Sequence, residues 1–194
     1  MEMYINIGNM SYFTGDNDIF EYFIESLFDI INAAPVKFNE EELIKYIYKY
    51  GFMSSRNYNI TPYCIILSKI KTNVFRSEDM QLINQHLNIL ENLAITSEAH
   101  NYESGTMETL HILKDIDDYL KKKNMEVNRF YLKNILISVI HSAEKNQHEH
   151  LKDRIVAESN ELLELKILKD QPEAVYGDSK TALGRDEPST PQVL

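Results

Sequence analysis

The stretch HSAEKNQHEH, residues 141–150, holds three of the six histidines of the chain together with two glutamates. Imidazole and carboxylate groups are the side chains that zinc binding and acid–base catalysis use. On a helix with about 100° per residue, His141, Glu144 and His148 would share one face, opposite the apolar residues of the preceding segment. The stretch also lacks the residue order of the HEXXH zinc proteases. We therefore interpret it as a solvated helix end rather than as a metal or catalytic site.

Glu108 and His111 form a second group with metal-ligand chemistry, a Glu-x-x-His pair. Di-iron helical bundles use this pair twice, with every ligand pointing into the bundle. Here we find a single such pair, and its spacing places it opposite the apolar residues of its own segment. We predict an exposed polar face at this position, with no metal, no cofactor and no catalytic residue.

The same polar face offers a contact surface for another protein. Glu108, Asp115 and Asp118 form an acidic stripe at helical spacing, and Tyr119 flanks it. Aromatic residues are enriched at protein interfaces, so a tyrosine beside the stripe favours a contact surface. Nearby lysines dilute the charge, and a plain solvated face is the alternative. We predict that these four residues bind a partner.

Three other polar features have structural interpretations. His86 lies among leucines, which favours a hydrogen-bonded core histidine. Cys64 lies next to isoleucines and is interpreted as a small buried hydrophobic residue. Residues 40–42 are three glutamates in the first turn of a predicted helix, where the helix dipole favours negative charge. The sequence also contains no Gly-rich phosphate loop and no GxSxG nucleophile motif.

A formal net charge of −10, from 30 acidic and 20 basic residues, is the bulk property that bears most on function. Such a surface repels phosphate backbones and attracts cationic partners, so we expect no direct nucleic-acid binding. Acidity that merely keeps the protein soluble is the alternative. The single cysteine cannot form an internal disulfide, no secretory signal is evident, and no stretch approaches the roughly 20 apolar residues that span a bilayer. We predict a cytoplasmic protein that does not enter the membrane; the sequence leaves its oligomeric state open.

The segments that carry these side chains are predicted to be helices. Gly51 should end the second of them, followed by a loop over residues 51–60. Residues 62–70 are either a helix or a short buried strand, because the run CIIL is too short for periodicity to decide. The remaining apolar residues recur at helical spacing and predict helices over residues 16–33, 39–50, 77–95, 106–123, 127–143 and 148–168.

We predict one all-α domain at residues 1–170, a single bundle of about six or seven helices. The segment 127–143 is apolar over much of its circumference, which favours a place near the centre of the bundle. Residues 171–194 change abruptly in composition and cannot bury enough apolar surface to offset their ordering entropy, so we expect a disordered or extended tail. We find no internal period of the kind that marks helical repeats.

These features predict a non-enzymatic, acidic protein-binding protein. The most concrete version is an inhibitor or immunity-type antidote that neutralises a cationic partner such as a toxin nuclease, because such enzymes present basic grooves that an acidic face can occlude. One alternative is a viral or bacterial helical-bundle protein that intercepts host signalling through a groove between helices. The other is a helical metal-dependent enzyme, in which the histidines and glutamates named above meet further ligands after folding.

Overall fold

A computed structural model describes residues 2–33 and 40–162, and these form eight α-helices without a strand. This confirms the predicted all-α class. The predicted tail at residues 171–194, and the proposed domain boundary before it, lie outside the described residues. In chain order the helices are α1 (Glu2–Thr14), α2 (Asn17–Ala33), α3 (Glu40–Arg56), α4 (Ile60–Arg76), α5 (Met80–Ala99), α6 (Glu103–Lys122), α7 (Glu126–Lys145) and α8 (Glu149–Leu162).

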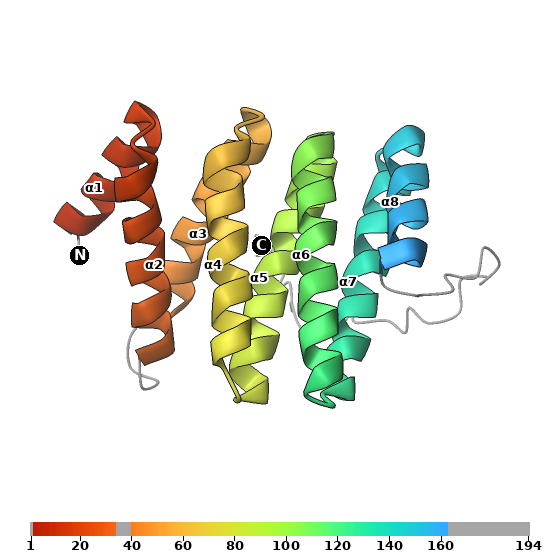
Figure 1. The fold of residues 1–194 in the computed structure, drawn as a ribbon. Coiled ribbons are helices and arrows are strands. Elements are labelled where there is room, and N and C mark those ends of the chain that lie inside the picture. Colours follow the sequence, from red (N-terminus) through yellow and green to blue (C-terminus); the bar gives the residue numbers. More distant parts are fainter. Residues whose placement is uncertain (1, 34–39, 163–194) are drawn as a thin grey trace, which may run out of the picture.

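The helices form a stack of two layers (Figure 1). α2, α4, α6 and α8 lie side by side in one layer, and α3, α5 and α7 form the second layer. α1 packs against α2 at one end of the stack. Each helix of the first layer also packs against its sequence neighbours in the second, so the chain advances as successive helical hairpins. This is the general arrangement of an α-solenoid, in which the core lies between the layers.

Successive hairpins repeat about every 44 residues, a spacing that several contacts within the two layers share. The Lys69–Glu25, Lys71–Asp115, Tyr119–Phe75, Asn128–Asn84 and Ser142–Glu98 hydrogen bonds each join residues 44 apart on neighbouring helices. The sequence analysis found no repeat because equivalent positions share a place in the packing and not a residue type. The repeat is therefore a property of the structure that residue identities do not show.

α1 was missed from the sequence, where the first predicted helix began at residue 16. Its inner side buries Ile5 and Tyr12, but Ile7, Met10 and Phe13 on its outer side are also apolar and are exposed. A helix with apolar residues on both sides has little amphipathic pattern. Periodicity therefore could not reveal it.

Gly51 does not end α3, contrary to the prediction, and the helix continues to Arg56. A Cβ atom at Gly51 would lie 2.1 Å from Cδ2 of Leu93, so the glycine lets α3 and α5 approach closely. The predicted loop is correspondingly shorter and comprises residues 57–59. Residues 62–70, left open as helix or strand, are helical and lie within α4.

α7 does not lie at the centre of a bundle, as its apolar circumference had indicated. It is a member of the second layer, beside α5, and packs against α6 and α8. Its outer side leaves Val127, Phe130 and Ile137 exposed at 65%, 66% and 40%. Within the described ranges, no helix is both long enough and apolar enough to cross a bilayer.

Candidate functional site

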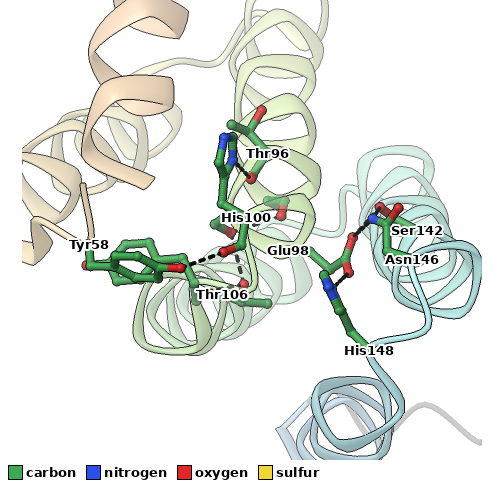
Figure 2. Close-up of polar contacts among 11 residues, drawn as sticks. Tyr58, Thr96, Glu98, His100, Thr106, Ser142, Asn146 and His148 are labelled. Atoms are coloured by element: carbon green, nitrogen blue, oxygen red, sulfur yellow. Dashed lines mark hydrogen bonds and ion pairs between the residues drawn. The ribbon is translucent and has the colours of Figure 1, made fainter. Parts of the chain in front are cut away.

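Polar residues of the HSAEKNQHEH stretch converge on one buried carboxylate, that of Glu98 (Figure 2). Glu98 lies in the last turn of α5, and its side chain is fully buried. His148 Nδ1 donates to Oε1 at 2.7 Å, and Asn146 Nδ2 donates to Oε2 at 3.0 Å. The Ser142 hydroxyl also donates to Oε2. Three donors from the end of α7 and the turn before α8 thus bind one acceptor on α5.

These donors offset an unfavourable position for a negative charge. A carboxylate near the C-terminal end of a helix meets the negative end of the helix dipole, and burial adds a desolvation cost. Hydrogen bonds from three side chains compensate both effects. Glu98 therefore joins the last described hairpin to the one before it.

His148 was predicted to share an exposed face with His141 and Glu144, and the structure separates it from them. The side chains of His141 and Glu144 are 66% and 52% exposed, as expected, with Nδ1 and Oε2 3.9 Å apart. His148 instead turns toward Glu98 and is 23% exposed. Among the described residues, no group of three or more His, Cys, Asp and Glu side chains could hold one metal ion.

The Glu98–His148 pair resembles the acid–base half of a catalytic triad, but its neighbours are arranged differently. A triad requires a nucleophile hydrogen-bonded to the histidine, which the acid orients from the other side. The Ser142 hydroxyl binds Glu98 and not His148. The arrangement therefore supports a structural role in joining α5 to the α7–α8 turn.

The turn between α5 and α6 is held by a second set of contacts, which Figure 2 also shows. The Tyr58 hydroxyl donates to the carbonyl oxygen of His100 at 3.2 Å. His100 Nδ1 lies 2.8 Å from the carbonyl oxygen of Thr96. The buried hydroxyls of Ser97 and Thr106 are 3.0 Å apart. These contacts fix the turn on the side opposite the Glu98 cluster.

The predicted acidic stripe lies on the solvent side of α6, but its carboxylates have cations beside them. Asp115 Oδ2 accepts a hydrogen bond from Lys71 Nζ of α4 at 2.9 Å. Asp118 Oδ1 accepts one from Lys114 Nζ of the same helix at 3.3 Å. Both carboxylates are about half exposed, at 51% and 48%. A partner that binds here would have to compete with these lysines.

The other two predicted binding residues, Glu108 and Tyr119, also make contacts within the chain. Glu108 Oε2 lies 3.6 Å from Nδ1 of His111, so the Glu-x-x-His pair is a local contact on an exposed helix face. The Tyr119 ring stacks on Phe75 with centroids 4.6 Å apart, and its hydroxyl donates to the Phe75 carbonyl at 3.0 Å. Partner binding by the α6 residues stays a prediction.

α2 carries a stronger acidic surface, which the sequence analysis did not identify. Asp18, Tyr22, Glu25 and Asp29 follow one another at steps of four, three and four residues and share one helix face. Tyr22 is 70% exposed, and α2 contains no basic residue. The acidic pattern can be read from the segment NDIFEYFIESLFDIINA, but the sequence analysis had used only the apolar residues of this segment to predict a helix.

Lys69 of α4 lies between α2 and the rest of the first layer. Its Nζ is 2.9 Å from Glu21 Oε1 and 3.2 Å from Glu25 Oε2. Burial tends to lower the pKa of Lys69, but hydrogen bonds and the charges of the two glutamates outweigh this and raise it. This lysine therefore stays charged and neutralises only the inner edge of the α2 stripe.

The second layer has a different charge pattern. Between their first and last turns, α3, α5 and α7 contain a single carboxylate, Glu91. Glu91 is partly buried and accepts hydrogen bonds from Tyr131 at 3.1 Å and Ser138 at 2.8 Å. Burial, followed by the charge of Glu91, raises the pKa of Tyr131 to about 12. In the central turns of the helices, acidic groups therefore lie mainly on α2, α6 and α8 of the first layer, whereas α4 has none.

Comparisons with known protein families, with curated proteins and with solved structures find no protein that matches this chain. We therefore classify the protein by its fold and by the distribution of charge on its surface. The described residues form a two-layer array of helical hairpins in which α2 and α6 of one layer carry outward carboxylates, whereas α4 between them carries none.

Proposed function

We propose that this protein acts by binding another protein, without catalysis, and that the outer face of α2 and α6 receives a cationic partner. The most concrete form of this proposal is an inhibitor or immunity-type antidote that covers the basic groove of an enzyme such as a toxin nuclease. An array of helical hairpins suits this role because it presents a long surface supported by a continuous core.

The observation that carries the proposal is the acidic face of α2. Four carboxylates lie on this helix without any basic residue, and the exposed ring of Tyr22 lies among them. Tyrosine is enriched at protein interfaces and among the residues that dominate binding energy. Carboxylates around such a residue would steer a cationic surface toward it and fix its orientation. The α6 stripe is a second acidic surface on the same layer, separated from α2 by α4, which has no carboxylate.

The lysines within the acidic layer do not prevent this binding. Exposed ion pairs contribute only about 0–1 kcal/mol, so Lys71 can release Asp115 to a partner at little cost. Lys69 is more firmly held, but its ion pairs are with Glu21 and Glu25 and not with Asp18 or Asp29. We therefore expect a partner to contact Asp18 and Asp29 first, together with Tyr22 between them.

The proposal is tested by affinity capture from the native source, followed by identification of the bound proteins. The immobilised baits are the wild-type protein and a variant with Asp18→Asn, Tyr22→Ala and Asp29→Asn. We expect the wild type to retain a basic protein at low salt, and we expect the triple substitution to lose it. Raising the salt concentration should also release the partner, because screening weakens interactions between exposed charges.

A matched control removes the same number of charges at the other end of the stack. Glu149→Gln with Asp153→Asn changes two exposed carboxylates of α8. This variant should retain the partner as the wild type does. If both variants lose binding equally, net charge and not the α2 surface explains it. Partners that are neutral or acidic and insensitive to salt would contradict the proposal.

A further inference from the structure

α1 is fixed on the stack in one orientation. A Cβ atom at Gly8 would lie 2.5 Å from the Phe23 ring, so the glycine allows α1 to lie directly against α2. The Tyr4 hydroxyl donates to the carbonyl oxygen of Phe23 at 3.2 Å. On α3, Tyr50 donates to Asn9 Oδ1 at 3.0 Å. These contacts determine which side of α1 faces away from the protein.

The outward side of α1 is apolar. Ile7, Met10 and Phe13 follow at steps of three residues and are 43%, 66% and 71% exposed. Asn6 and Thr14 are the other exposed residues of this side, and residues 4–14 contain no charged side chain. Adjoining exposed apolar side chains on one helix side are characteristic of an interaction surface.

We infer that α1 is a self-association surface, on which a second copy of this chain packs its own α1 about a two-fold axis. A protein with a formal net charge of −10 repels its own copies over most of its surface. Residues 4–14 of α1 contain no charged side chain, so two copies can meet there without opposing carboxylates. Two-fold contacts use the same patch on both subunits, so a self-complementary apolar face is sufficient.

Stacking of α1 on the opposite end of another copy is disfavoured by the surface of α8. α1 and α8 lie at opposite ends of the array (Figure 1). Glu149, His150 and Asp153 are exposed on α8. Head-to-tail contact would bury these polar groups against the apolar side chains of α1 without hydrogen-bond partners, which costs free energy. The symmetric α1 contact avoids this cost.

The size of the surface predicts a weak dimer. A helix of 13 residues is about 20 Å long, and a single contact of this length buries less area than a standard stable interface. We therefore expect mostly monomer at about 1 µM and a substantial dimer fraction at about 100 µM. Added salt should strengthen association, because it screens the repulsion between the acidic subunits.

Sedimentation velocity over this concentration range tests the inference with a matched pair of variants. Phe13→Glu should remain monomeric throughout. Phe130→Glu on α7 is the control, since Phe130 is 66% exposed and receives the same substitution. It should dimerise as the wild type does. Circular dichroism confirms that both variants are folded.

A covalent trap provides the second measurement. In a Cys64→Ser background, Met10→Cys should form disulfide-linked dimers on mild oxidation, whereas Phe130→Cys should not. A wild type that stays monomeric at all concentrations would overturn the inference, as would loss of the dimer in Phe130→Glu but not in Phe13→Glu. Equal cross-linking of the two cysteine variants would also overturn it. None of these outcomes bears on partner capture by α2, which is measured with separate substitutions and has the opposite salt dependence.

Discussion

His148 and Glu98 lie 50 residues apart in the sequence, yet Nδ1 of the histidine is 2.7 Å from Oε1 of the buried carboxylate. The contact joins the turn before α8 to the end of α5. It gives a structural contact to His148, one of the residues that first suggested a metal or catalytic site. Among the described residues, no group of three or more His, Cys, Asp and Glu side chains could hold a metal ion.

Replacing His148 should therefore destabilise the fold. His148→Ala removes a hydrogen bond to a buried charge, and we expect the free energy of unfolding to fall by about 1.5–3 kcal/mol. Urea denaturation followed by circular dichroism measures the change. His150→Ala is the matched control, because His150 is exposed and its replacement should change stability by less than about 0.5 kcal/mol. Equal effects in the two variants would contradict this role of His148.

The buried hydroxyl of Tyr63 should contribute to stability where α4, α5 and α6 meet. It donates to the Leu93 carbonyl oxygen at 2.9 Å and lies 3.2 Å from the Thr109 hydroxyl. Tyr63→Phe removes this buried hydrogen bond, and we expect a loss of about 0.5–1.5 kcal/mol in thermal or urea unfolding. Tyr58→Phe removes a solvent-exposed hydrogen bond to the His100 carbonyl oxygen, from a residue that is 63% exposed, and should cost less than about 0.5 kcal/mol. A neutral Tyr63→Phe would show that the three helices do not depend on this contact.

Gly51→Ala tests the close approach of α3 and α5. Alanine has the better helix propensity by about 1 kcal/mol, which alone would stabilise the variant. Its Cβ would lie 2.1 Å from Cδ2 of Leu93, however, and we expect overpacking to cost about 1–3 kcal/mol and to outweigh that gain. A double-mutant cycle with Leu93→Ala measures the coupling: the penalty of Gly51→Ala should shrink when the leucine is shortened. If the penalty of Gly51→Ala is the same with leucine and with alanine at position 93, the contact with Leu93 is not its cause.

His86 should make stability depend on pH. Burial lowers its pKa from the ordinary value of 6.5, although the Leu82 carbonyl partly opposes the shift. The unfolded chain therefore binds a proton more readily than the folded protein. The stabilisation is present above about pH 6.5 and is lost as the pH falls below that value. His86→Gln cannot titrate, so the stability difference between the wild type and this variant should decrease between pH 7.5 and 5.5 in urea unfolding. A difference that is constant with pH would contradict the effect.

Sequence reasoning identified the helices where one side is apolar and the other polar. Leu110, Leu113, Ile116 and Leu120 predict α6 because the packing of α6 buries one stripe. The same reasoning missed α1, whose outer side is also apolar. Gly51 was interpreted as a helix end because glycine disfavours helices, and only the position of Leu93 shows why it lies inside one. Local pattern therefore predicts elements, but not the close contacts between them.

The candidate surface was predictable only in part, for a related reason. Glu108, Asp115 and Asp118 of α6 were identified correctly as solvent-facing, but Lys71, which pairs with Asp115, lies 44 residues away in the sequence. The α2 stripe was readable from its own residues, since no basic residue interrupts it. The convergence of Ser142, Asn146 and His148 on Glu98 depends on how α7 lies beside α5. Such convergence becomes visible only after the hairpins are stacked.

The most direct test of the proposed function is the affinity of the purified partner, once captured, for the wild-type protein and for the α2 triple variant. Isothermal titration at low and at high salt measures it. We predict at least a tenfold loss of affinity, about 1.4 kcal/mol, for the variant with Asp18→Asn, Tyr22→Ala and Asp29→Asn, and a similar trend for the wild type as salt increases. Undiminished affinity of the folded variant at low salt would contradict the proposal that the acidic face of α2 is where this protein binds.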